Sequence, residues 1–92
     1  MTILQIDIED AHPVKAICDA EFLSVTLRDG RELRSPLWWY PRLLAASPAQ
    51  RADIELMPMG VHWPQVDEDI SVASILRGRK APGATPQRDG RD

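Results

Sequence analysis

The feature that most constrains this chain is an alternation of apolar and polar residues beside one tight turn. In the segment FLSVTLRDGRELRSPL, Leu, Val and Leu alternate with Ser and Thr ahead of the Asp29-Gly30 pair. A repeat of two residues is typical of a strand with one buried face, and an Asp-Gly pair is typical of a hairpin turn. The segment therefore predicts strands at 22–28 and 31–37.

The length of the loop decides which side chains face one another across this hairpin. A two-residue turn would set Val25 against Arg34, so that an apolar and a charged residue would share one face. A three-residue loop at 28–30 sets Val25 against Leu33 and keeps the faces uniform. It also places Gly30 where such loops need a left-handed backbone. We therefore expect the three-residue loop.

The remainder of the chain predicts short elements separated by proline and glycine. Extended segments are expected where apolar residues alternate or cluster between turn residues, at 2–8, 14–19, 54–57 and 61–63. Short helices are expected at 41–46, 48–52 and 72–77. Together these elements predict an α+β fold, a small and mostly antiparallel sheet of four to six short strands with two or three short helices on one side.

The helix boundaries follow from residues that satisfy free backbone groups. Pro41 suits a first helical position, where its missing N–H costs nothing. Ser47 precedes Pro48 in the same way and can cap the second helix. Ser71 or Asp69 can cap the last helix. Gly78 is expected to end that helix, because glycine readily adopts the left-handed conformation found there. A further corner is expected where Trp63 ends a strand and Pro64 breaks it.

Composition separates a folded part from a tail. Residues 79–92 hold no apolar residue larger than Ala apart from Pro, which predicts a disordered tail after a single domain at 1–78. The domain holds seven basic and twelve acidic residues, for a net charge of −5, and the tail has a net charge of +2. An acidic domain disfavours direct contact with a phosphate backbone and favours a basic partner.

The predicted compartment is the cytoplasm. Cys18 is the single cysteine, so no intrachain disulfide can form, and a reducing environment fits. The sequence shows no basic leader and no apolar run near the roughly 18 residues that a membrane span needs. We expect no contact with a membrane.

The residues capable of chemistry do not form a recognisable catalytic set. Cys18 shares a predicted strand face with apolar neighbours, which favours an inert thiol. No nucleophile elbow, phosphate-binding loop or dinucleotide fingerprint is present. His62 has no second ligand at metal-binding spacing, and the adjacent acids Asp67, Glu68 and Asp69 are typical of a solvated loop without apolar surroundings. We expect no enzymatic activity, no cofactor and no metal.

The aromatic residues indicate a contact surface. Trp38 and Trp39 are consecutive, so an extended backbone would send one into the core and the other to the surface. An exposed Trp near Arg42 and the acids is typical of a binding hot spot, and the alternative is that both Trp cover the core. The candidates for partner binding are Trp38, Tyr40, Arg42, His62, Asp67, Glu68 and Asp69. The candidates for structural roles are Gly30, Pro41, Trp63, Pro64, Ser71 and Gly78.

Two segments together resemble a known family. WYPRLLAASPAQRA at 39–52 is followed by GVHWPQVDEDISVASILRG at 60–78, and this order is similar to that of bacterial domain-of-unknown-function family twenty-four forty-two. The resemblance covers about residues 12–78. It implies a compact α+β domain, sometimes joined to a helix-turn-helix module and often encoded beside a second small family, as toxin–antitoxin pairs are. It implies no catalytic residues. LMPMG at 56–60 replaces a Gly-rich stretch of many relatives, and its methionines add apolar surface.

These observations predict a non-catalytic, antitoxin-like domain that binds a small protein partner. The alternative is an accessory or regulatory subunit of a larger assembly, with weak or indirect contact to nucleic acid, including a phage-type inhibitor. This chain shows no helix-turn-helix segment, which argues against direct DNA binding.

Overall fold

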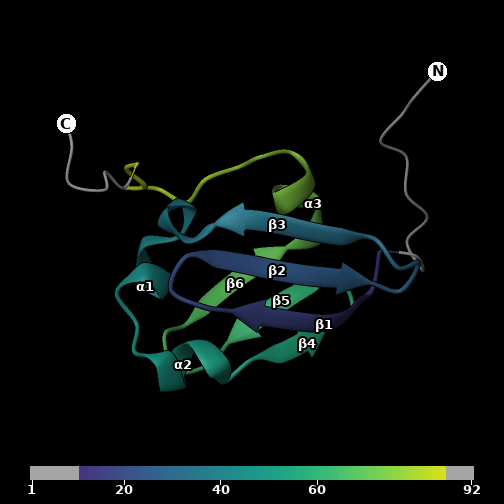
Figure 1. The fold of residues 1–92 in the computed structure, drawn as a ribbon, viewed down its shortest axis with the longest axis horizontal. Coiled ribbons are helices and arrows are strands. Elements are labelled where there is room, and N and C mark those ends of the chain that lie inside the picture. The colour runs from purple at the N-terminus through teal and green to yellow at the C-terminus, as the bar shows by residue number, and fades with distance from the viewer. Residues whose placement is uncertain (1–10, 87–92) are drawn as a thin grey trace.

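Residues 11–86 are described by the computed structural model, and they form two three-stranded antiparallel sheets (Figure 1). The first sheet has the order β1-β2-β3, with β1 at Pro13–Cys18, β2 at Phe22–Leu27 and β3 at Glu32–Pro36. The second has the order β4-β5-β6, with β4 at Glu55–Met57, β5 at Gly60–Trp63 and β6 at Glu68–Ser71. The strand predicted at 2–8 lies outside the described residues.

Four short helical segments complete the fold. They are the 3₁₀ helix η1 at Leu37–Trp39, α1 at Pro41–Leu44, α2 at Pro48–Ala52 and α3 at Val72–Leu76. Figure 1 shows α1 and α2 at one end of the two sheets and α3 beside β3. The α+β class is therefore confirmed. The strands do not form one sheet, however, because the helical segment 37–52 carries the chain away from β3 before the second sheet begins.

The predicted hairpin register is confirmed. Val25 pairs with Leu33, and the backbone N–H of Leu27 donates to the carbonyl of Arg31 over 2.8 Å. Gly30 has a φ of 95°, the left-handed conformation that the three-residue loop requires. The Asp29 carboxylate accepts a hydrogen bond from the backbone of Arg31 and closes the loop. Matching of apolar positions across the hairpin therefore sets its register.

The helix boundaries also follow the capping residues. Ser47 and Gln50 form a reciprocal capping box at the start of α2. The side chain of Ser71 accepts a hydrogen bond from the backbone of Ser74 at the start of α3, so Ser71 and not Asp69 is the cap. Gly78 follows that helix with a φ of 72°. Pro41 occupies the first turn of α1, which ends at Leu44.

The acidic stretch is a strand rather than the predicted loop. The chain turns between Trp63 and Glu68, and Asp67 adopts a φ of 54° within that turn. Asp tolerates this left-handed conformation better than most residues. Glu68 then pairs with Trp63, and Asp69 pairs with His62. The apolar Ile70, which is buried, draws the segment back along β5, so the acids belong to an ordered sheet.

The hydrophobic core lies between the two sheets. Leu23, Val25 and Leu27 of β2 face Val61 and Trp63 of β5 in one buried cluster. Each buried aliphatic side chain contributes about 1.5–3 kcal/mol relative to exposure. Trp63 is fully buried in this core, and its indole N–H donates to the carbonyl of Arg51 over 3.1 Å. The strand ends at this residue, as the following Pro64 predicts.

The extended backbone predicted for the paired tryptophans is wrong. Trp38 and Trp39 lie on the 3₁₀ helix rather than on an extended strand, and both are half-buried. A helix with about three residues per turn does not send neighbours to opposite sides. Packing also continues past Gly78, since the backbone N–H of Ala81 donates to the carbonyl of Trp39 over 2.9 Å. Residues 87–92 of the predicted tail lie outside the described residues.

Candidate functional site

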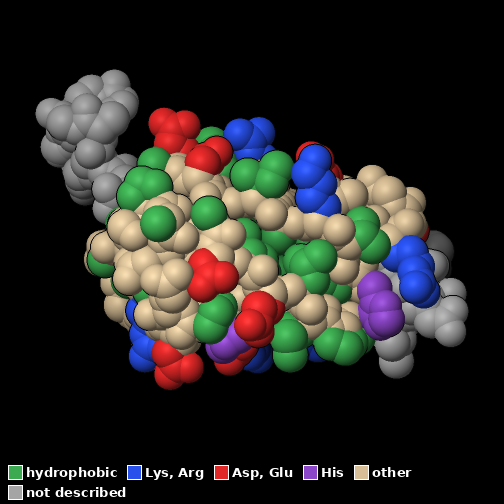
Figure 2. All heavy atoms as spheres, turned by 90° about the horizontal axis from the view of Figure 1, so that it is seen from below, with side chains coloured by type: hydrophobic (Ala, Val, Ile, Leu, Met, Phe, Trp, Pro, Cys, Tyr) green, Lys and Arg blue, Asp and Glu red, His purple; other side chains and the backbone are tan. Residues whose placement is uncertain are grey.

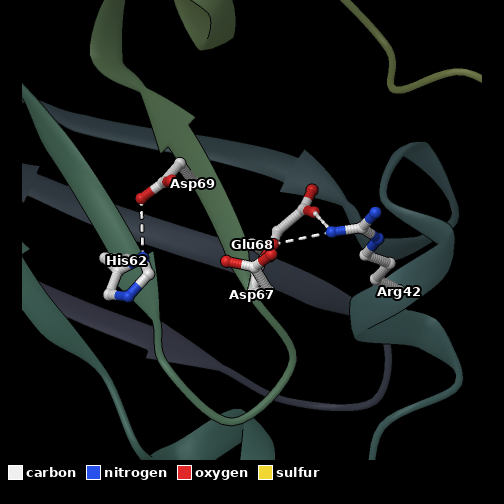
Figure 3. Close-up of polar contacts among 5 residues, drawn as sticks. All are labelled: Arg42, His62, Asp67, Glu68 and Asp69. Carbon is white, nitrogen blue, oxygen red and sulfur yellow. Dashed lines mark hydrogen bonds and ion pairs between the residues drawn. The ribbon is translucent and has the colours of Figure 1, made fainter.

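Arg42 connects α1 to the turn between β5 and β6. Its Nη1 donates to the backbone carbonyl of Asp67 over 2.7 Å and lies 3.9 Å from Oε1 of Glu68 (Figure 3). The Arg42 side chain is 62% exposed, whereas that of Glu68 is 14% exposed. Asp67 therefore contributes its backbone carbonyl to the contact with Arg42. This contact holds the turn in place, and most of the guanidinium remains available to solvent.

Glu68 occupies an environment that the sequence did not predict. It pairs with Trp63 across β5 and β6, on the face that the core residues share. Burial is the main cause of its raised pKa, which Arg42 lowers and which the neighbouring Asp69 and Asp67 raise further. The expectation of solvated acids without apolar surroundings is therefore wrong for Glu68.

Two of the aromatic candidates are not free surface residues. Tyr40 is buried, so its side chain is not available to a partner in this structure. Burial raises the pKa of Tyr40, and the nearby Ser35 hydroxyl lowers it, although neither hydroxyl makes a hydrogen bond of ordinary geometry. Trp38 packs edge-on against Trp39 with ring centroids 6.4 Å apart. The ammonium of Lys80 lies 4.7 Å from the centroid of Trp39, a cation–π contact that covers this corner.

His62 and Asp69 form an ion pair on the outer face of the second sheet. They are cross-strand partners, and Nδ1 of His62 lies 2.6 Å from Oδ1 of Asp69 (Figure 3). Glu55 of β4 is the partner of His62 on the other side. We call Glu55, His62 and Asp69 the charged row. The hydrogen bond to Asp69 is the main cause of the raised pKa of His62; burial opposes it, and both acids raise it further.

Exposed apolar side chains lie on the two edge strands that meet on one side of the molecule. The large hydrophobic side chains that are exposed within residues 11–86 are Val14, Ile17, Leu56, Met57 and Met59, between 43% and 52% exposed. We call these five residues the apolar seam. They belong to β1, to β4 and to the turn after β4, and β1 lies next to β4. Figure 2 views this side and shows hydrophobic side chains spread across it with acidic side chains among them.

Only some residues of the apolar seam are marked by a signal in the sequence. Met57 and Met59 stand in the segment that replaces a Gly-rich stretch, which is a usable signal. A regular strand at 14–19 would place Val14 on the same face as Ala16 and Cys18. A β-bulge between Pro13 and Lys15 instead turns Val14 outward, and no pattern in the sequence marks this bulge.

A hollow of about 420 Å³ adjoins the seam and the charged row. Its lining includes Met57, Pro58, Met59, Gly60, Asp69 and Ser71. Gly60 is required here, because a Cβ atom would lie 2.6 Å from the carbonyl oxygen of Ile70. The absence of a side chain lets β5 approach β6 closely. We call this space the methionine hollow.

A second hollow, of about 450 Å³, lies near the Arg42 contact. Its lining mixes the basic side chains of Arg42, Arg79 and Lys80 with the acidic side chains of Glu68 and Asp69. Opposite charges around one space do not select a single class of ligand. This hollow therefore favours no particular chemistry.

The groups that chemistry would require are dispersed. Burial raises the pKa of Cys18 to about 11, so its thiol is protonated at neutral pH and a weak nucleophile. Within residues 11–86, no three side chains of His, Cys, Asp or Glu are placed to hold a metal ion. The same residues include no helix long and apolar enough to cross a membrane.

Comparison with known proteins gives a family and two similar structures. The family model described as "Protein of unknown function (DUF2442)" matches residues 13–81. A protein of unknown function from Rhodospirillum rubrum is similar with a TM-score of 0.68 and 26% identity, over 79% of this chain and 93% of that chain. An uncharacterized protein from Chromobacterium violaceum has a TM-score of 0.67 and 24% identity, over 78% and 70%, and supports the fold alone. No curated protein matches at a significant level.

Proposed function

The chain belongs to the DUF2442 family, and from its surface we propose that it is a non-catalytic, antitoxin-like domain that binds a small protein partner in the cytoplasm. The observation that carries this proposal is the apolar seam. Exposed apolar side chains that gather on one part of a surface are typical of protein–protein contact sites. Here they gather on two neighbouring edge strands and the turn beside them.

The charges around the seam favour a basic partner. Glu55 and Asp69 are exposed on the second sheet, next to the strand that carries Leu56 and Met57. Acidic groups at the rim of an interface speed the encounter with a basic surface and oppose an acidic one. The seam would supply most of the buried apolar area, and the charged row would orient the partner.

Capture of the tagged full-length chain from its host, followed by mass spectrometry, tests the proposal. We expect one small protein in stoichiometric amount. Replacing Leu56, Met57 and Met59 together by Ser should then weaken binding of the purified partner about tenfold or more, since roughly 1.4 kcal/mol corresponds to a factor of ten. A control variant carrying Arg28→Gln and Glu32→Gln at the hairpin end should bind normally.

Two results would contradict this function. Capture of nucleic acid or of a large assembly would favour the accessory-subunit alternative. Partner binding that the triple Ser variant leaves unchanged would place the contact surface elsewhere on the molecule.

A further inference from the structure

We propose that the methionine hollow binds an extended segment of the partner in which an apolar residue and a Lys or Arg are separated by one residue. This inference rests on the proposed protein-binding function and specifies the chemistry of the segment that is recognised. Three properties of the surface lead to it: the apolar lining of the hollow, the charge beside it and the distance between the two.

The lining of the hollow suits an apolar side chain. Met57 and Met59 are both exposed next to it, and Pro58 lies between them. Methionine side chains are flexible and polarisable, so they adapt to an inserted group. Gly60 lines the hollow without a side chain, and its backbone lies close against that of Ile70 in β6. An apolar side chain placed here would be removed from water at little conformational cost to the sheet.

The charge beside the hollow suits a basic group. Asp69 lines the hollow and its side chain is 75% exposed. Glu55 lies on the same face, across His62. Asp69 pairs with His62, and within the described residues no Lys or Arg forms an ion pair with Asp69 or Glu55. A second copy of this chain would present the same acids to them, and like charges disfavour that contact. A basic segment of another protein is the complementary occupant.

The spacing of the two features sets the sequence pattern. Met57, Gly60 and Ser71 form one cross-strand row, and the charged row lies two residues further along the same strands. Two residues of a strand span about 7 Å. In an extended segment, the side chains of residues i and i+2 lie on one face and are also about 7 Å apart. An apolar residue in the hollow therefore places a Lys or Arg at i+2 or i−2 over Glu55 and Asp69.

A peptide titration tests this recognition directly. The probe is the capped peptide Thr-Leu-Thr-Lys-Thr, added to the full-length ¹⁵N-labelled chain and followed by NMR. We expect amide shift changes centred on Met57, Gly60, Asp69 and Ser71, with a Kd on the order of 1 mM for so small a ligand. The control peptides Thr-Ser-Thr-Lys-Thr and Thr-Leu-Thr-Glu-Thr should lose these changes.

Variants of the chain give a second, matched comparison. Met57→Ser with Met59→Ser should abolish the shift changes, and Asp69→Asn should weaken binding by about fivefold, the effect of losing an exposed ion pair. Arg28→Gln with Glu32→Gln changes exposed side chains at the hairpin end of the first sheet and should bind the peptide normally. An unchanged spectrum of the remaining amides shows that each variant is folded.

The outcomes separate this inference from the function on which it rests. No shift at millimolar peptide, or shifts that survive loss of the Leu or the Lys, would overturn the recognition pattern. Self-association through this face in sedimentation experiments would also overturn it, because the occupant would be a second copy. If the chain nevertheless captures a protein partner whose binding ignores Met57 and Asp69, the protein-binding function holds and only the assignment of the hollow fails.

Discussion

At the scale of single residues, the pair of His62 and Asp69 makes the surface sensitive to pH. The pair raises the pKa of His62 above its ordinary value of about 6.5. Replacing Asp69 by Asn should lower that pKa, because the hydrogen bond to a carboxylate is the main cause of the shift. An NMR titration of the His62 imidazole protons measures it. Glu32→Gln, on the other sheet, should leave the midpoint unchanged.

The sign of the linked stability follows from the same shift. A pKa raised in the folded state means that the folded chain binds a proton more tightly than the unfolded chain. The stabilisation by the pair is therefore fully present below about pH 6.5 and is lost as the pH rises through the raised pKa of His62. Asp69→Asn should flatten the pH dependence of unfolding in that window. An unaltered dependence would show that another group causes it.

At the scale of elements, the close approach of β5 and β6 depends on Gly60. In Gly60→Ala, the new Cβ would lie 2.6 Å from the Ile70 carbonyl oxygen and 3.0 Å from the Cα of Ser71, both backbone atoms. The strands must separate, and we expect a loss of about 2 kcal/mol in the free energy of unfolding, as in overpacked cores. Urea denaturation measures this loss.

Gly30→Ala is the matched control for the crowding at Gly60. Nothing lies within 4 Å of its added Cβ, so only the φ of 95° is unfavourable, at a cost of about 1 kcal/mol. If Gly60→Ala lowered the free energy of unfolding by no more than Gly30→Ala does, that result would contradict the tight contact between β5 and β6.

Elements defined by neighbouring residues were predictable from the sequence, and those defined by distant contacts were not. The hairpin register followed from Val25 and Leu33, and α2 followed from its Ser47 cap. Strand β6 was missed because Glu68 and Asp69 look solvated in isolation, and only their pairing with β5 makes them a strand. Of the candidate site, the sequence supplied His62 and the acids but not their pairing in space.

At the scale of the whole molecule, the helical segment between β3 and β4 decides how the strands divide. It carries the chain from one sheet to the other, so the apolar faces of both sheets close on one core. The edge strands β1 and β4 then meet on one side, where the apolar seam lies. On this view the exposed surface is a consequence of the two-sheet topology, which explains why local patterns did not reveal it.

The contacts of residues 79–81 set the boundary of the folded unit. Ending the chain after Gly78 removes the hydrogen bond from Ala81 to Trp39 and the stacking of Lys80 on the Trp39 ring. A hydrogen bond contributes about 1 kcal/mol and an exposed cation–π contact about 0.5–1 kcal/mol. We therefore expect the shortened chain to lose about 2 kcal/mol and to melt roughly 10 °C lower, as is typical of a domain of this size.

A chain ended after residue 86 is the control, because it keeps both contacts with Trp39. Calorimetry of the two shortened chains and the full chain gives the comparison, and Trp fluorescence reports the exposure of the Trp39 ring. Equal melting temperatures for the chain ended after Gly78 and the control would place the boundary of the folded unit at Gly78. If only the chain ended after Gly78 melts at a lower temperature, the folded unit includes Lys80 and Ala81. This outcome would agree with the family match over residues 13–81.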